Sequence, residues 1–440
     1  MRGSGTAAAL LLLGALAGCG GDSITPPPTN STADEVRQLA AERHITALAK
    51  PATVRPALVA LGQALAFDKE LSGNRDISCM SCHLPARSTS DARSLSIGTG
   101  GTGLGPNRTG TPIARNSPAV FNLTQLNSMF WDGRVQLQDG TVHTPAGAQV
   151  TPAMQKVFEF GALSAQPMFP PATAAEMRGT SGNELAGFTD NDEAQIWAGL
   201  MTRLGAIPKY REMFEAAYPG VPFDSMNFAY ASNAIAGFLV SRFAFNNSPW
   251  DRFLAGDDDA LSPDALAGAV LFMKGKCSVC HNGPAFTDNK FHDVAVAQIG
   301  PGAGDGAGGT DDFGRMRVTG NMTDQYAFRT PPLRNVELTG PYGHDGAITD
   351  LRAFVAHYSE SDLKLRDYDV SQVDPTLQGT LQQNFDGILA HRDTLLNGVV
   401  FTDQQIDQIT AFMKALTDPA ARDLTSAIPD SVPSGLPIDR

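Results

Sequence analysis

Four of the five cysteines form two pairs with the same spacing, and a histidine follows each pair directly. Two thiols separated by two residues can each form a thioether with one vinyl group of a haem, and the adjacent histidine can then bind the iron. A zinc site or a redox-active disulfide would use the same residue types, but two complete copies of the pattern favour two covalently bound haem c groups. The residues are Cys79, Cys82 and His83 in the first motif and Cys277, Cys280 and His281 in the second.

The fifth cysteine, Cys19, follows an apolar segment at the amino terminus. Residues 1–18 combine one basic residue, a short apolar run and small residues, which is the pattern of an export signal. The segment Leu16-Ala17-Gly18-Cys19 resembles a bacterial lipobox, which implies cleavage before Cys19 and lipidation of its thiol. An ordinary cleaved signal with a spare cysteine is the alternative. Glycine rather than aspartate follows Cys19, which favours the periplasmic side of the outer membrane.

The charge balance limits the partners of the chain. Its 33 lysines and arginines and its 46 aspartates and glutamates give a net charge of −13 over 440 residues. Nucleic-acid binding needs a basic footprint, so this balance argues against a nucleic-acid partner. An apolar fraction of 42% with only 18% charged residues indicates a folded globular protein.

Short motifs around the two cysteine pairs recur in the same order, which indicates a duplicated domain. An apolar segment containing glycine precedes each pair, a Thr-Pro motif ending in Arg-Asn follows, and an Asp-Gly motif comes next. Each half ends in an apolar pattern with helical spacing. The sequence thus predicts a mainly α-helical fold with two cytochrome c-like domains and long ordered loops. The corresponding segments are 62–67 and 268–272, 111–116 and 330–335, 131–133 and 344–346, and 234–239 and 406–416.

The composition also predicts approximate boundaries. Residues 19–45 begin with glycine, serine, threonine and three consecutive prolines, which is typical of a tether. We expect the first haem domain over residues 46–252, the second over 253–425, and a tail over 426–440. Thr402 and Gln405 have the spacing of a capping box at the start of the last helix.

Taken in this order, the motifs resemble the bacterial di-haem cytochrome c peroxidase and MauG superfamily. The resemblance rests on the two cysteine motifs, on Phe130-Trp131-Asp132-Gly133-Arg134, and on two segments within 330–346. It extends over roughly residues 55–420. It implies an amino-terminal haem that reacts with hydrogen peroxide, a carboxy-terminal haem that relays electrons, and a calcium ion between them.

The same resemblance implies roles for individual residues. His83 corresponds to the proximal ligand of the peroxide-reacting haem and His281 to that of the relay haem. Trp131 corresponds to the tryptophan between the haems, where an oxidisable indole passes electrons. The alternative for Trp131 is a large side chain in the core.

Glu176 resembles the catalytic glutamate of the family, and Gln166 lies ten positions before it, at the spacing of the family's distal glutamine. A carboxylate in a dry pocket can take a proton from one peroxide oxygen and return it to the other. The competing interpretation is a capping box formed by Thr173 and Glu176.

The resemblance also implies the calcium ligands. They are the side chain of Asn116 and the main-chain carbonyls of Thr339 and Pro341, which are hard oxygen donors of the kind that calcium prefers. A plain turn would explain each of these residues taken alone.

Two positions depart from many family peroxidases. Thr99 stands where those enzymes carry a second histidine, so we expect an open, five-coordinate first haem that needs no reductive activation. Tyr358 lies fourteen positions after His344, where many members carry a methionine ligand and MauG-like members a tyrosine. A phenolate would lower the potential of the second haem. The alternatives to Tyr358 as distal ligand are His357, Met316 and Met322.

The leading hypothesis is therefore a peroxidase that reduces hydrogen peroxide to water with electrons from a small c-type cytochrome or a cupredoxin. One alternative is a MauG-like oxidase that modifies residues of a partner protein through a strongly oxidised di-haem state. Another is a di-haem electron carrier without enzymatic activity. The lipid would be the only contact with a membrane, and a homodimer is compatible with the resemblance because many family peroxidases are dimers.

Overall fold

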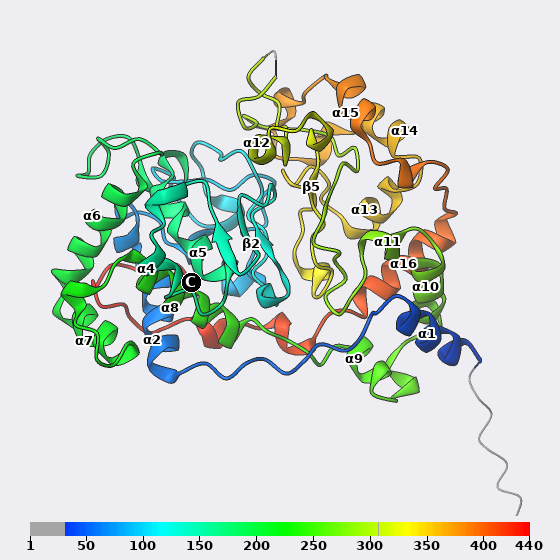
Figure 1. The fold of residues 1–440 in the computed structure, drawn as a ribbon. Coiled ribbons are helices and arrows are strands. Elements are labelled where there is room, and N and C mark those ends of the chain that lie inside the picture. The colour runs from blue at the N-terminus through cyan, green and yellow to red at the C-terminus, as the bar shows by residue number, and fades with distance from the viewer. Residues whose placement is uncertain (1–30, 307) are drawn as a thin grey trace, which may run out of the picture.

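The computed structural model describes residues 31–306 and 308–440, and these form two helical bodies joined side by side (Figure 1). Long irregular segments connect the helices, and the few strands are short. The mainly α-helical class predicted from the sequence is confirmed. The predicted export signal at 1–18 and Cys19 lie outside the described residues. Within the described ranges, no helix combines the length and apolar character that crossing a bilayer requires.

The first domain contains seven α-helices and an antiparallel sheet in the order β1-β2-β3. Its core lies where α2 packs along α8, and α5 and α7 flank this pair. The helices are α2 (Pro56–Phe67), α3 (Cys79–Cys82), α4 (Pro152–Gln155), α5 (Ala162–Ala165), α6 (Glu193–Gly205), α7 (Pro208–Ala217) and α8 (Phe228–Arg242). The strands are β1 (Ser128–Met129), β2 (Val135–Gln138) and β3 (Thr141–His143).

The second domain is built around the packing of α10 against α16. Strands β4 (Phe291–His292) and β5 (Phe328–Arg329) form a two-stranded antiparallel sheet. The helices are α1 (Ser31–Glu42), α9 (Pro249–Leu254), α10 (Pro263–Lys274), α11 (Cys277–Cys280), α12 (Met316–Thr319), α13 (Leu351–His357), α14 (Ser361–Arg366), α15 (Phe385–His391) and α16 (Asp403–Lys414).

The two central helix pairs cross at equivalent glycines. A Cβ atom on Gly62 would lie 1.8 Å from the carbonyl oxygen of Ala234, and one on Gly268 would lie 1.9 Å from that of Gln408. Only glycine permits backbones to approach so closely. Because Gly62 and Gly268 open the first pair of repeated motifs, this shared crossing supports the predicted duplication.

The repeated Asp-Gly motifs also share one local geometry. Oδ1 of Asp132 accepts a hydrogen bond of 3.1 Å from the nitrogen of Arg134, and Oδ1 of Asp345 accepts one of 3.1 Å from the nitrogen of Ala347. The glycine that follows each aspartate has a positive φ, +68° at Gly133 and +65° at Gly346. A side chain on Gly133 would collide with Phe291 of the second domain, and one on Gly346 with Ser94 of the first. Each Asp-Gly motif thus packs closely against the other domain.

The predicted tether is wrong for residues 31–42, which form helix α1. Ala33, Val36 and Ala40 recur at helical spacing, and this apolar stripe is buried against the core of the second domain near α10. The predicted boundary at 252/253 is also corrected. It falls inside α9, whose Trp250 is fully buried in the second core.

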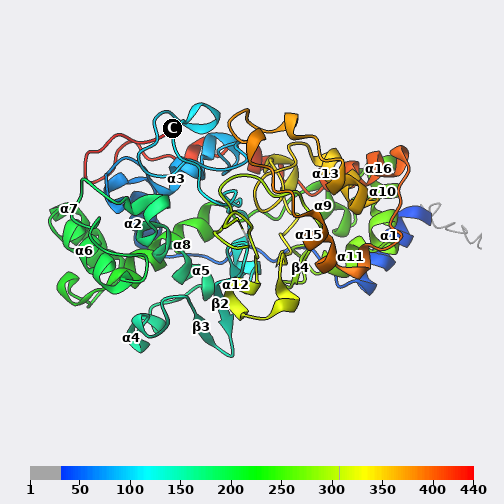
Figure 2. The same cartoon turned by 90° about the horizontal axis from the view of Figure 1, so that it is seen from above.

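The sequence suggested a tail over residues 426–440, but these residues pack against the first domain. Ala427 and Val432 belong to the core of the first domain. Asp439 forms an ion pair of 2.7 Å with Lys69 and accepts a hydrogen bond from Ser81, which lies between the first two haem-motif cysteines. The described chain therefore begins with α1 on the second domain and ends on the first domain, near α3 (Figure 2).

The last long helix begins as predicted. The Thr402 side chain accepts from the nitrogen of Gln405, and the Gln405 side chain accepts from the nitrogen of Thr402. Ile406, Ile409 and Phe412 then face the core, in agreement with the predicted helical pattern.

Candidate haem and peroxide site

One largely apolar cavity runs through both domains and brings together every predicted site residue that the structure describes. The sequence separates these residues by as much as 279 positions, from Cys79 to Tyr358. The residues on the cavity wall are Cys79, Cys82, His83, Asn116, Trp131, Gln166, Glu176, Cys277, Cys280, His281, Thr339, Pro341 and Tyr358.

The first cysteine motif forms the short helix α3, and His83 follows at its carboxyl end. Burial raises the pKa of the Cys79 thiol to about 12, and the nearby carboxylate of Glu176 adds to this effect. Burial also lowers the pKa of His83 to about 4. Neutral thiols and a neutral imidazole therefore line this end of the cavity, and none of the four described cysteines is in a disulfide.

Glu176 lies in a single π-helical turn, Ala174–Arg178. Burial raises the pKa of its carboxyl group, while the positive charge of Arg134 lowers it to a smaller extent. The competing capping box does not form, since the Thr173 side chain accepts no hydrogen bond from this turn; its hydroxyl donates to the carbonyl of Phe169. Glu176 and Gln166 both line the cavity, and Glu176 lies near the thiols of the first motif.

Thr99 lies outside the cavity wall. Its hydroxyl donates a hydrogen bond of 2.8 Å to Asp76 and accepts one of 3.2 Å from Asn74. Its main-chain nitrogen donates to the carbonyl of Glu176 at 2.9 Å. The loop that carries a histidine in many family peroxidases thus supports the backbone of Glu176 here, and its hydroxyl is engaged elsewhere.

The second motif repeats this arrangement in α11. Nδ1 of His281 lies 2.9 Å from the carbonyl oxygen of Phe286, which leaves Nε2 as the other ring nitrogen for a ligand. Burial raises the pKa of the Tyr358 phenol, and the neighbouring thiols of Cys277 and Cys280 add to the increase. Tyr358 therefore faces the second motif in the same way as Glu176 faces the first.

The alternatives to Tyr358 lie elsewhere. Nε2 of His357 is 2.8 Å from the carbonyl oxygen of Val294, and the side chain is outside the cavity wall. Met316 is on α12, also away from the cavity, and Met322 is 59% exposed.

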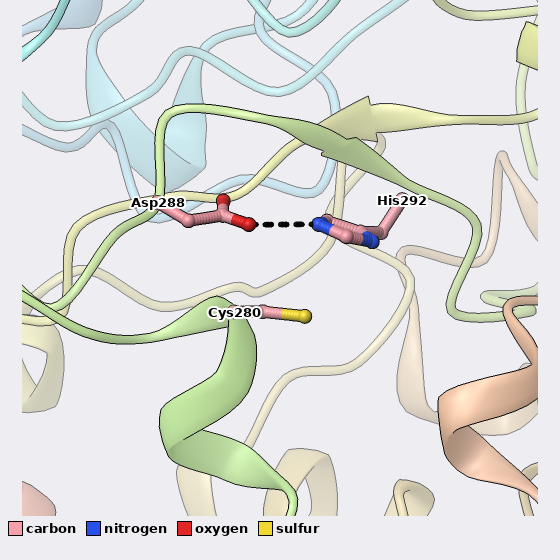
Figure 3. Close-up of side chains that lie close together, drawn as sticks. All are labelled: Cys280, Asp288 and His292. Carbon is pink, nitrogen blue, oxygen red and sulfur yellow. Dashed lines mark hydrogen bonds and ion pairs between the residues drawn. The ribbon is translucent and has the colours of Figure 1, made fainter. Parts of the chain in front are cut away.

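His292 of β4 lies beside the second motif, close to Asp288 and Cys280 (Figure 3). Its ring nitrogens are 3.0 Å from Asp288 and 2.6 Å from Asp393. Asp288 contributes most to raising the pKa of His292 to about 11, and Cys280 and Asp393 raise it further. The ligand atoms of Cys280, Asp288 and His292 lie within 4.8 Å of one another. Because Cys280 belongs to the second haem motif, we assign this cluster to the edge of that site.

Trp131 lies at the junction of the two domains. Its indole Nε1 donates a hydrogen bond of 2.9 Å to the carbonyl of Asn116, and the nitrogen of Asn116 donates one of 2.9 Å to the carbonyl of His344. The His344 ring stacks on Phe328 with 3.8 Å between the ring centroids. His344 therefore orders this region through its main chain and by ring stacking.

Arg115 ties the Trp131 segment to the second domain. It forms ion pairs of 2.6 Å with Asp132, the neighbour of Trp131, and of 2.6 Å with Asp312. All three side chains are largely buried. Burial would raise the pKa of Asp312, but Arg115 outweighs burial and holds this pKa below its usual range. Arg115 belongs to a motif that the sequence singled out, but its repetition alone did not indicate an ion pair between the domains.

The three predicted calcium ligands all line this cavity. Nδ2 of Asn116 donates to the carbonyls of Arg93 and Ser94 at 2.9 and 3.2 Å, which leaves its Oδ1 as an oxygen donor. Thr339 and Pro341 lie on the same cavity wall. Three such oxygens fit a hard cation that completes its shell with water.

The cavity fits two haem c groups by its chemistry. Each end presents a pair of unbridged thiols and one histidine, and the walls are mostly apolar. The guanidinium of Arg329 also faces this cavity while buried, and an anionic group such as a haem carboxylate would match it. No sequence pattern indicated a role for Arg329, since it precedes the repeated motif by one position.

Comparisons with known proteins agree with this chemistry. The family model described as di-haem cytochrome c peroxidase matches residues 56–259. The methylamine utilization protein MauG of Methylophilus methylotrophus is 30% identical over 325 residues, which cover 72% of this chain and 76% of that protein. The cytochrome c551 peroxidase of Pseudomonas aeruginosa is 32% identical over 308 residues, covering 69% of this chain and 72% of that enzyme.

Two solved structures share the fold. A MauG-like protein associated with microbial copper homeostasis aligns with a TM-score of 0.60 and 24% identity over 87% of this chain and 97% of that one. The diheme peroxidase BthA from Burkholderia thailandensis aligns with a TM-score of 0.60 and 21% identity over 84% of this chain and 88% of that one. Together with the sequence relatives and the paired haem motifs, they show that the chain belongs to the di-haem cytochrome c peroxidase and MauG superfamily.

Proposed function

We propose that this protein is a di-haem c-type peroxidase that reduces hydrogen peroxide to water with electrons from a small periplasmic redox protein. The observation that carries the proposal is the position of Glu176 beside the first haem motif, in a cavity that continues past Trp131 to the second motif. An acid–base group and a tryptophan between two redox sites are the parts that such a reaction needs.

When bound, the two haems supply redox-active irons that accept electrons and react with peroxide. Cys79 and Cys82 would hold the first haem by thioethers, with His83 as its proximal ligand. Cys277, Cys280 and His281 would hold the second in the same way. Tyr358, on the same cavity wall, would supply a further ligand to the second haem.

The carboxyl group of Glu176 would move the proton. As a carboxylate it accepts the proton of the near peroxide oxygen, and it then donates that proton to the far oxygen, which leaves as water. Burial raises the pKa of Glu176 towards the pH at which both transfers are efficient. The amide of Gln166 lines the same cavity and would orient the peroxide by hydrogen bonding.

Trp131 would carry electrons between the two sites. Its indole N–H donates to a carbonyl, which is a poor proton acceptor, so the indole keeps its proton while its electron moves. The apolar wall of the cavity keeps bulk water away from this path.

Tyr358 favours one alternative function, the oxidation of residues on a partner protein. A phenolate is a hard ligand that stabilises oxidised iron, and a stabilised oxidised state has time to react with a protein. The MauG relative is 30% identical to this chain over 325 aligned residues. The third hypothesis, a simple electron carrier, finds less support because no histidine occupies the Thr99 position.

The remaining assignments follow the same proposal. Calcium would bind Asn116, Thr339 and Pro341, and a lipid on Cys19 would hold the protein at the periplasmic side of a bacterial membrane.

One experiment separates the three functions. The purified holoprotein is mixed with hydrogen peroxide, and the haem spectra and peroxide consumption are followed with and without a reduced c-type cytochrome. Rapid consumption that depends on the cytochrome supports the peroxidase. A long-lived oxidised spectrum with slow consumption supports protein oxidation, and the absence of any reaction with peroxide contradicts both enzymatic functions.

A further inference from the structure

Arg329 is a buried cation without an acidic partner. Its side chain is 4% exposed, and no carboxylate of the described chain lies within ion-pair distance of it. Nε donates to the carbonyl of Phe130 at 3.2 Å and Nη1 to that of Thr330 at 3.3 Å, while Nη2 has no partner among the described residues. Burial alone lowers the pKa of Arg329 to about 10.

The other deeply buried arginines are compensated. Arg178, Arg203 and Arg334 each pair with a carboxylate, at Asp190, Glu184 and Asp251 respectively. Arg108 has no acidic partner, but each of its three side-chain nitrogens donates to a carbonyl of the surrounding loop. A buried cation without such partners is strongly unfavourable. Arg329 therefore requires an anion that the described chain does not provide.

The position of Arg329 limits where this anion lies. The residue is at the end of β5, paired with Phe291 of β4, and it faces the cavity. The next residue, Thr330, accepts a hydrogen bond of 2.7 Å from Thr287 within the second domain. On its other side, the main-chain nitrogen of Arg329 donates to the carbonyl of Trp131 at 2.8 Å. The guanidinium thus lies between the relay tryptophan and the second haem site.

We propose that Arg329 binds a propionate carboxylate of the haem attached at Cys277 and Cys280, and so acts as a positioning residue for electron transfer. This inference rests on the proposed function, because it needs a haem in that site. A guanidinium can bind a carboxylate through two parallel hydrogen bonds. Since Nε and the backbone nitrogen are already engaged with residues 130 and 131, the pair would fix the haem edge relative to Trp131.

The pairing has an electrostatic consequence. A positive charge beside a haem disfavours its oxidised, more positive state and therefore raises its midpoint potential. The same charge keeps the propionate ionised. Replacing Arg329 should thus lower the potential of the second haem and allow its propionate to take up a proton near neutral pH.

The test is a spectroelectrochemical titration of the Arg329→Gln holoprotein. Glutamine keeps the backbone N–H that donates to Trp131, so the titration isolates the guanidinium. At a fixed electrode potential, we expect the ratio of oxidised to reduced second haem to rise about tenfold, which corresponds to a potential about 59 mV lower for one electron. We also expect this potential to become pH-dependent between about pH 5 and pH 8, because a buried carboxylate that has lost its cation takes up a proton in this range.

Three controls make the result decisive. Arg329→Lys keeps the charge and should restore most of the potential. Arg317→Gln removes an arginine that is 43% exposed on α12, and should leave both potentials unchanged. The pyridine haemochrome assay counts the haems in each sample. If two haems are bound and the potential of the second is unchanged in Arg329→Gln, or if only the first haem shifts, the proposal is wrong. Absence of haem from the wild-type protein would overturn the proposed function as well.

Discussion

The indole of Trp131 and the main-chain carbonyl of Asn116 share a hydrogen bond of 2.9 Å. The residue proposed as the electron relay is therefore held by the residue proposed as a calcium ligand. The nitrogen of Asn116 extends the link to the carbonyl of His344 in the second domain. A change at the calcium site should consequently reach both the relay and the domain junction.

Replacement of Asn116 should remove calcium. We expect Asn116→Ala to lose the ion in elemental analysis of the purified holoprotein and to lower the midpoint of thermal unfolding, because an oxygen ligand is missing. Asn335→Ala is the matched control at the equivalent position of the second repeat. Its side chain accepts from Asp418 at 2.9 Å, so this variant should lose about 1 kcal/mol of stability but keep calcium. Equal calcium content in both variants would contradict the assignment.

Glu176→Gln should slow the reaction with peroxide by a factor of about 10² to 10⁴ without changing the resting haem spectrum, because the amide cannot accept the proton. In the wild type, burial raises the pKa of Glu176. On acidification, the reactive carboxylate should therefore become protonated at a higher pH than an ordinary glutamate would. Stopped-flow measurement of the second-order rate against pH tests both statements. Glu212→Gln, on the exposed face of α7, is the control and should react at the wild-type rate.

The Thr99 position predicts the spin state of the first haem. The hydroxyl is engaged by Asp76 and lies outside the cavity wall, so it cannot serve as a sixth ligand. Electron paramagnetic resonance of the protein as isolated should show a high-spin ferric signal, and Thr99→Ala should retain it. Exclusively low-spin signals in the wild type would refute the five-coordinate assignment.

Tyr358→Phe should change the absorption spectrum of the second haem and raise its potential, because the phenolate ligand is lost. His357→Gln should leave the spectrum of that haem unaltered, since the imidazole lies outside the cavity wall and contacts the carbonyl of Val294. The opposite pattern would make His357 the ligand.

The ion pairs of Arg115 predict how stability depends on pH. Asp312→Asn leaves Arg115 with one carboxylate instead of two, and we expect a loss of about 3 kcal/mol in the free energy of unfolding. In the wild type, Arg115 outweighs burial and lowers the pKa of folded Asp312. The stabilisation is therefore complete above the pKa of an unfolded aspartate and disappears as the pH falls through the lower, folded value. The variant should show a flatter acid limb in denaturant titrations.

Asp386→Asn provides the comparison for that experiment. Asp386 pairs with Arg366 on the surface, where its side chain is 90% exposed. Water and salt screen such a pair, so the free energy of unfolding should hardly change. A similar loss in both variants would mean that burial of the Arg115 pairs is not what stabilises the domain junction.

The haem motifs, the helical class and the last capping box were predictable because each depends on residues close together in the sequence. Cys277 and His281 lie within one turn and a half, and Thr402 and Gln405 within one turn. The resemblance to a family added Glu176, Trp131 and Tyr358, and the structure brings all three to one cavity. The variants above test the chemical roles of Glu176 and Tyr358.

Long-range ion pairs and terminal segments were not predictable in this way. Arg115 and Asp312 are 197 positions apart, and no local pattern links them. Helix α1 was missed because prolines and glycines just before it suggested a tether, while its stripe of Ala33, Val36 and Ala40 has only three small or medium side chains. Arg329 was missed because its special feature is the lack of a partner, which only the packed structure reveals.

The carboxyl-terminal segment packs on the first domain, and this determines the order in which the two domains can be completed. The first domain is encoded before the second, yet Ala427 and Val432 complete its core and Asp439 contacts Lys69 and Ser81. A polypeptide synthesised from its amino terminus therefore cannot complete the core of this domain until Ala427 and Val432 have been made. During that interval the first cysteine motif lacks the hydrogen bond between Ser81 and Asp439, so the segment around Cys79 reaches its final packing only after the second domain has been made.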